Sequence, residues 1–292
     1  MNLSKIKEFL KKKIENKHEY ELLCEFYKLS DTEADFKFLL QILLKNQESN
    51  ISYKFLKLFC LVSLKLNEKE LAYNSLLSLH KKVPANVETI SLIAYLEQSL
   101  DFPPTSNFFD LKRDIHFFDT GLGSLYNSSD LIKVIKKVAK ENYEPSDQSV
   151  KKGSVYFLKR GLDSNLDDFL GKVLPFFDEA IQKIKLSSPF IMKQEELKKI
   201  SFWAVSIKEG GNMEPHFHPQ GKMSGVIYIN VDDKSSGDFV TGAAPSGMID
   251  STNELTIAIK NFRIIVFPSY YLHKTLFNSS ATERFSMSFD LI

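Results

Sequence analysis

The stretch ISFWAVSIKEGGNMEPHFHPQGKMSGVIYINV, residues 200–231, decides the fold of the second half of the chain. Its two ends are rich in β-branched and aromatic residues, and glycine, asparagine and proline interrupt the segment between them. Short runs of that composition, bounded by turn-forming residues, are typical of β-strands. We therefore expect strands over 200–208, 213–218 and 223–231.

Further strand-like runs follow, separated by glycine, proline, asparagine and serine: 237–241, 254–259, 262–267, 270–277 and 283–291. A set of about eight short antiparallel strands is typical of a sandwich or jelly roll. In the mixed section upstream we expect strands at 113–118 and 153–159 and helices at 128–142 and 165–186. The fold class that follows is α+β, with a jelly-roll domain and its flanking helices over 113–292.

Residues 1–100 have a helical period instead and contain no strand candidate. We expect helices at 4–16, 18–29, 32–46, 51–66, 68–82 and 87–100. Consecutive prolines, Pro103 and Pro104, force extended backbone and stop any helix, so we place a linker at 101–112. The chain is thus expected to hold an all-α domain over 1–100 and the jelly-roll domain after the linker.

One part of the helical region resembles a tetratricopeptide repeat. In a unit of about 34 residues that begins at Tyr53, Leu56 takes the place of the apolar anchor and Pro84 that of the proline that ends the second helix. Cys60 and Ala72 take the places of the two small residues that let the helices approach closely. A generic helical domain is an equal alternative. A helical-repeat domain offers a concave surface for a protein partner, or an internal support.

Composition excludes several classes of function. The chain has 292 residues, of which 43% are hydrophobic and 26% charged, so a globular protein is expected. Its formal net charge of +1 gives no overall field that would hold nucleic acid or an anionic membrane. No run approaches the ~18 apolar residues of a membrane span, and no signal peptide is recognisable, so a cytoplasmic location is expected.

Three of the six histidines, His216, His218 and His273, fall among the predicted strands. Residues two apart on an extended segment point to the same face, so His216 and His218 can enter one cavity. A third imidazole from a later strand would complete a three-sided metal site with an open face. Ordinary core or surface histidines are the alternative, because a His-x-His pair also arises by chance.

Arg284, one of only four arginines, follows His273 closely in the sequence. If 270–277 and 283–291 pair as neighbouring strands across the turn at 278–280, Arg284 enters the cavity of the distal histidine. Its guanidinium would bind a carboxylate in bidentate fashion, and the Ser286 hydroxyl on the same face would add a hydrogen bond. Trp203, the single tryptophan, is expected in the core, with a place at the mouth of the cavity as the alternative.

These motifs carry a resemblance to a known family. PHFHPQGKMSGVIYINV (215–231), RIIVFPSYYLHKTLFN (263–278) and ERFSMSFDL (283–291) resemble the 2-oxoglutarate/Fe(II) oxygenases related to prolyl 4-hydroxylases, with their H-x-H-P, S-G-x-x-Y, F-P-S, H and R-x-S elements. The resemblance covers 200–292 closely and 113–200 loosely. It implies a double-stranded β-helix, the cupin-like form of the jelly roll, and Fe(II), 2-oxoglutarate and O₂ as cofactors.

The resemblance also implies roles for single residues. His216 and His273 would hold Fe(II), with His218 as third ligand where most of the superfamily has aspartate or glutamate, and Glu214 is the alternative third ligand. The distal carboxylate of 2-oxoglutarate would meet Arg284, with help from Ser286 and from Tyr228; core packing is an equal interpretation of Tyr228.

The expected activity is hydroxylation of an unidentified small-molecule or peptidyl substrate, with release of succinate and CO₂. Two alternatives remain open: a cupin-like three-histidine enzyme or sensor that does not use 2-oxoglutarate, and a helical-repeat interaction scaffold with a degenerate barrel.

Overall fold

A computed structural model describes residues 3–10, 17–46, 52–84, 86–98, 104–139, 143–144, 149–159, 161, 163–185, 200–245, 248 and 253–292. The chain divides into two compact units, Met1–Thr105 and Ser106–Ile292. The division falls inside 101–112, the segment expected to be a linker. Each unit is described by itself.

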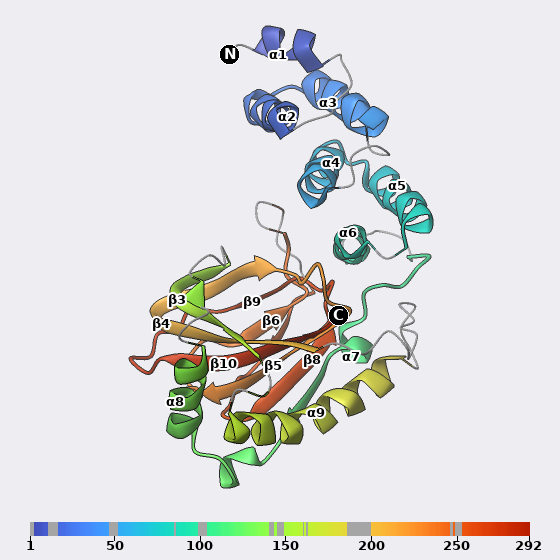
Figure 1. Cartoon of the computed structure of the whole chain (residues 1–292). Helices are drawn as coiled ribbons and strands as arrows, with labels where there is room; N and C mark the ends of the chain where they lie inside the picture. Colours follow the sequence, from blue (N-terminus) through green and yellow to red (C-terminus); the bar gives the residue numbers. More distant parts are fainter. Residues whose placement is uncertain are drawn as a thin grey trace. The chain divides into compact units, whose positions relative to one another are not determined.

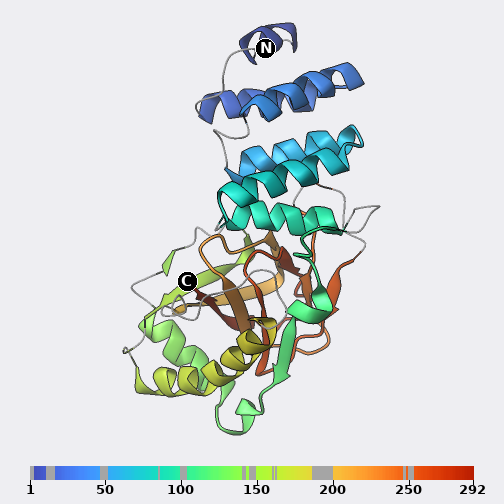
Figure 2. The same ribbon diagram turned by 90° about the vertical axis from the view of Figure 1, so that its right-hand side faces the viewer.

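The described part of the first unit is helical (Figure 1): α1 (Leu3–Leu10), α2 (Lys17–Leu29), α3 (Glu33–Asn46), α4 (Tyr53–Lys65), α5 (Lys69–Lys82) and α6 (Val87–Glu97). Figure 2 shows α2 to α6 in successive layers, and side chains such as Leu43, Phe59 and Leu76 are buried. Asn86 caps α6 by accepting a hydrogen bond from the Thr89 amide at 2.6 Å. Each helix overlaps a predicted range, although the predicted helical segments 11–16 and 99–100 lie outside the described residues. The tetratricopeptide-like repeat remains a prediction.

The second unit is built on antiparallel strands: β1 (His116–Asp119), β2 (Tyr143–Glu144), β3 (Val150–Leu158), β4 (Ile200–His216), β5 (Met223–Asn230), β6 (Phe239–Thr241), β7 (Leu255–Ile257), β8 (Arg263–Pro268), β9 (His273–Thr275) and β10 (Arg284–Leu291). The sheet has the order β1-β8-β5-β10-β4-β9-β6-β7, and β3 pairs with β4 and with β2. This curled antiparallel sheet is consistent with the expected jelly roll.

Helices accompany the sheet: α7 (Leu111–Asp114), α8 (Ser128–Val138) and α9 (Ser164–Lys185), with a short 3₁₀ turn, η1, at Leu122–Ser124. The Asn127 side chain caps α8 by accepting from the Asp130 amide. Among the described residues of both units, no helix combines the length and the apolar character needed to cross a bilayer.

Strand β4 corrects the prediction of separate strands at 200–208 and 213–218. The backbone stays extended from Ile200 to His216, and Gly210 adopts a φ of 70° within it, a conformation that glycine accepts without strain. Glycines that read as a turn in the sequence therefore shift the register of a continuous strand. As a result β4 pairs with β10 through 200–207 and with β9 at 213–216.

The expected hairpin between 270–277 and 283–291 is wrong. Met213 of β4 pairs with β3 on one side and with β9 on the other, while β10 pairs with β4 on the edge opposite β3. Strands β9 and β10 therefore follow one another along the same edge of β4. The chain does not reverse between them, because Asn278 exchanges backbone hydrogen bonds with Gly210 and Gly211 of β4.

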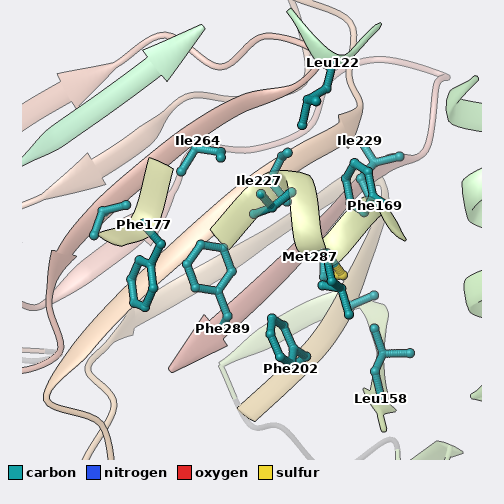
Figure 3. Close-up of a cluster of buried hydrophobic side chains, with 14 of the residues drawn as sticks. Leu122, Leu158, Phe169, Phe177, Phe202, Ile227, Ile229, Ile264, Met287 and Phe289 are labelled. Atoms are coloured by element: carbon teal, nitrogen blue, oxygen red, sulfur yellow. The ribbon is translucent and has the colours of Figure 1, made fainter. Parts of the chain in front are cut away.

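The sheet has two chemically different faces in the region of β4, β5, β8 and β10. On β10, Phe285, Met287 and Phe289 belong to the hydrophobic cluster that α8 and α9 cover (Figure 3). The Phe177 ring of α9 meets the Phe289 ring edge-on, with 4.6 Å between centroids. Because side chains alternate along a strand, the residues between them must face the other way, into the interior of the curl. That inner face holds the candidate site.

Candidate active site

The three histidines converge where β4 ends and β9 begins. His216 and His273 are direct partners in the β4–β9 ladder, and their ring centroids lie 4.2 Å apart. His218 follows β4 by two residues, with ring centroids 5.3 Å from His216 and 4.9 Å from His273. Each ring offers one nitrogen to a group whose atoms lie within 4.8 Å of one another. The structure thus brings together all three predicted metal ligands.

Hydrogen bonds select the nitrogen that each ring offers. Nδ1 of His216 lies 2.9 Å from the Glu214 carbonyl, and Nδ1 of His273 lies 3.0 Å from the Tyr271 carbonyl. Nδ1 of His218 lies 2.6 Å from a carboxylate oxygen of Asp290. Since carbonyl and carboxylate oxygens accept hydrogen bonds, each Nδ1 carries the proton in the neutral ring. Each Nε2 is then left with the lone pair that a metal requires.

The environment of His273 keeps its imidazole neutral. The side chain is buried, with the Phe267 and Phe239 rings at centroid distances of 4.5 and 5.6 Å. Burial lowers the pKa of His273 well below its usual value, and the neighbouring His216 and His218 lower it further. A neutral ring is the form that binds a metal, so the donor set fits Fe(II).

Arg284 brings a buried positive charge to the same cavity. Its side chain donates from Nη1 to the carbonyl of Gly237 at 2.8 Å and from Nη2 to Oγ1 of Thr275 at 2.6 Å. Among the described residues, no carboxylate forms an ion pair with it. Burial lowers the pKa of this guanidinium from its ordinary value, since the charge is costly to desolvate. A buried guanidinium without an acidic partner is suited to binding an anion.

Ser286 and Tyr228 complete this end of the cavity. They are direct partners in the β10–β5 ladder, so their side chains share the inner face. Both are buried, and burial raises the pKa of the Tyr228 phenol, which stays protonated at neutral pH. A cavity of about 400 Å³ is lined by both residues, by Arg284 and by all three histidines. This cavity, called the site cavity below, therefore joins three imidazoles to a buried guanidinium.

The structure gives no support to the alternative role of Glu214 and corrects the predicted place of Trp203. Glu214 is absent from the described group of metal-binding side chains and bonds to Asn212, 3.3 Å away. Trp203 is only partly buried and lines the site cavity, with its ring centroid 5.3 Å from that of His218, so its preferred placement in the core is wrong. Its neighbours Phe202 and Ala204 take the core positions instead.

The sequence interpretation missed Asp290 and Thr275. Asp290 is buried and accepts hydrogen bonds from His218 and Ser224, and Thr275 holds the Arg284 guanidinium. A signal for Asp290 was present, because steps of two from Arg284 lead along β10 through Ser286 and Ser288 to Asp290. No local signal pointed to Thr275, whose role depends on β9 and β10 lying end to end.

Comparisons with known proteins find a family match within the second unit. Residues 201–290 match the family described as "Putative 2OG-Fe(II) oxygenase", and no curated protein matches. Similar solved structures include a prolyl-4-hydroxylase of Pseudomonas putida, with 15% identity over 62% of this chain and 94% of that one and a TM-score of 0.45. Another is a Trichoplax adhaerens prolyl hydroxylase in complex with a hypoxia-inducible-factor peptide. Its sequence identity is 11%, the match covers 70% of this chain and 89% of that one, and the TM-score is 0.44. Likenesses this distant define neither substrate nor mechanism.

The fold and the site together define a class, a curled antiparallel sheet with a three-histidine group that could hold a metal ion. The family match narrows that class: over residues 201–290 it supports a 2-oxoglutarate/Fe(II)-dependent oxygenase, a family whose cofactors are Fe(II), 2-oxoglutarate and O₂.

Proposed function

We propose that the chain is a hydroxylase in which His216, His218 and His273 bind Fe(II) and Arg284 binds the distal carboxylate of 2-oxoglutarate. The observation that carries the proposal is the pairing, in one cavity, of three clustered imidazoles, whose Nδ1 atoms face carbonyl or carboxylate oxygens, with a buried guanidinium that has no acidic partner among the described residues. When bound, Fe(II) and 2-oxoglutarate supply oxidative decarboxylation to succinate and CO₂, coupled to hydroxylation of a substrate C–H bond.

The protein's own residues position the cosubstrate and keep water out. The Nε–H and remaining Nη2–H groups of Arg284 suit a carboxylate, since the hydrogen bonds in the structure use Nη1 and one Nη2–H. The hydroxyls of Ser286 and Tyr228 donate to the same carboxylate. The rings of Phe239 and Phe267 shield His273 from solvent, which strengthens each electrostatic contact in the site.

For the substrate we propose a peptidyl or amino-acid-like molecule, with another small organic molecule as the alternative. The support is the sequence resemblance to prolyl 4-hydroxylases, and the wall of the site cavity is compatible with it. Phe157, Trp203 and Phe217 line that wall, and an apolar, aromatic lining suits an organic group better than a free ion. The first unit is proposed to offer a surface for a protein partner.

Turnover of 2-oxoglutarate tests the proposal. Purified full-length protein, supplied with Fe(II), O₂ and 2-oxoglutarate, is expected to release succinate even without its substrate, at a slow uncoupled rate. His273→Ala should abolish that release. Binding of Fe(II) without any succinate release, with or without candidate peptides, would instead favour the cupin-like function without 2-oxoglutarate, which the all-imidazole donor set also fits.

A further inference from the structure

A buried carboxylate lies directly behind His218. Asp290, near the end of β10, is 7% exposed and lines the site cavity. One of its oxygens lies 2.6 Å from Nδ1 of His218 and 2.6 Å from the Ser224 hydroxyl, which donates to it. His218 follows β4 and Ser224 lies on β5, so three segments meet at this carboxylate. Asp290 is therefore held in place by the fold, and it contacts the Nδ1 atom of His218 and not the Nε2 atom that is offered to a metal.

The contacts around Asp290 also hold the backbone of His218. The hydroxyls of Ser224 and Ser269 lie 2.7 Å apart, and the Ser269 carbonyl accepts a hydrogen bond from the His218 amide at 2.9 Å. Gly221 packs on the same network, because a Cβ there would come within 2.6 Å of the Ser269 hydroxyl and 3.0 Å of Cγ of Asp290. The network thus restrains His218 through both its ring and its main chain.

The negative charge of Asp290 indicates that the network around His218 does more than pack side chains. Among the described residues, the basic group recorded beside Asp290 is the imidazole of His218, and a buried carboxylate is costly unless a positive charge or several donors compensate it. The three proposed ligands are neutral imidazoles and bring no negative charge to a divalent cation. A cation on Nε2 of His218 polarises the N–H at Nδ1 and strengthens its hydrogen bond to a carboxylate. Asp290 and the metal then stabilise each other through one ring.

We propose that Asp290 is a positioning residue of the metal centre. It accepts the Nδ1–H hydrogen bond of His218, which directs Nε2 toward the metal. It also supplies, from behind the imidazole, the negative charge that a carboxylate ligand would supply directly. This inference rests on the proposed function, since it takes His218 to be a ligand.

Metal titration tests the inference without reference to turnover. Metal-free full-length protein is titrated with Co(II), whose visible absorption reports both affinity and ligand geometry. Asp290→Ala is expected to weaken Co(II) binding roughly 10- to 100-fold, the usual effect of removing a carboxylate that supports a ligating histidine. Asp290→Asn should lose less, because its amide oxygen still accepts the Nδ1–H bond without the charge.

A double variant shows whether Asp290 affects Co(II) affinity through His218 or independently of it. His218→Ala is expected to bind Co(II) more weakly than Asp290→Ala, and His218→Ala combined with Asp290→Ala no more weakly than His218→Ala alone. Asp35→Ala is the matched control, since Asp35 is 5% exposed and also bonds a hydroxyl and a cation, Thr32 and Lys7, in the first unit. Its Co(II) affinity should equal that of the unaltered protein.

The outcomes distinguish failure of the inference from failure of the proposed function. Loss of affinity in His218→Ala but not in Asp290→Asn or Asp290→Ala, or additive losses in the double variant, overturns the role of Asp290 alone. Unchanged affinity in His218→Ala with loss in Glu214→Ala overturns the proposed ligand set itself. Thermal unfolding of the metal-free variants checks their folding, and Asp290→Asn, which keeps the size of the side chain, carries the test if Asp290→Ala does not fold.

Discussion

Arg284 shows how a single residue can define the chemistry of a cavity. It is 2% exposed, and its recorded partners are backbone carbonyls and the Thr275 hydroxyl, none of which carries a negative charge. A second buried arginine of the same unit, Arg263, instead forms a two-pronged ion pair with Asp119. The contrast separates an arginine whose charge is paired with a carboxylate from one that we propose binds an anion.

This contrast supplies a matched pair of variants. Arg284→Lys keeps the charge but loses the forked donors, and each hydrogen bond to a charged group contributes about 1.5–3 kcal/mol. We therefore expect the KM for 2-oxoglutarate to rise roughly 10- to 150-fold in steady-state succinate assays. Arg263→Lys should leave that KM unchanged while lowering the melting temperature. Equal KM values for the two variants would remove Arg284 from the cosubstrate site.

At the scale of elements, β10 separates core and site by alternation alone. Phe285, Met287 and Phe289 pack under the helices, whereas Arg284, Ser286, Ser288 and Asp290 line the site cavity. A shift of one residue in the register of β10 would exchange the two sets and bury the arginine in the core. The register is therefore as important to the site as the identity of its residues.

Gly225 of β5 protects this register on the core side. It lies opposite Phe289 in the ladder, and a Cβ at this position would approach the Phe289 ring to 2.4 Å. Gly225→Ala is expected to lower the free energy of unfolding by about 1–3 kcal/mol, as overpacking does. In chemical denaturation, Gly171→Ala serves as the control. It lies in α9 with nothing within 4 Å of the added methyl, and should be neutral or stabilising. Equal free energies of unfolding for Gly225→Ala and Gly171→Ala would show that the Phe289 ring moves aside without an energetic cost.

At the scale of the whole molecule, the site belongs to one of the two compact units. Every proposed ligand, Arg284, and the hydrogen-bond partners named for them lie within Ser106–Ile292. The described part of the first unit contributes helices with buried apolar side chains.

A shortened chain tests this division. Residues 106–292, produced without the first unit, are expected to bind Co(II) with the affinity of the full chain and to release succinate from 2-oxoglutarate at a similar rate. The measurement is a parallel metal titration and succinate assay on both lengths. Loss of metal binding by a shortened chain that still unfolds cooperatively would show that the helical unit supports the site.

The sequence by itself determined the helices of the first unit, most strands of the second, and the three histidines and the arginine that meet in the cavity. Those features depend on local period and on the side-chain chemistry of His216, His218, His273 and Arg284, which are readable without coordinates. Only the tertiary structure decided that β9 and β10 lie end to end on β4, and that Asp290 rather than Glu214 accompanies the histidines. Strand partners and buried hydrogen bonds join residues far apart in the chain, and no local pattern specifies which distant groups will meet.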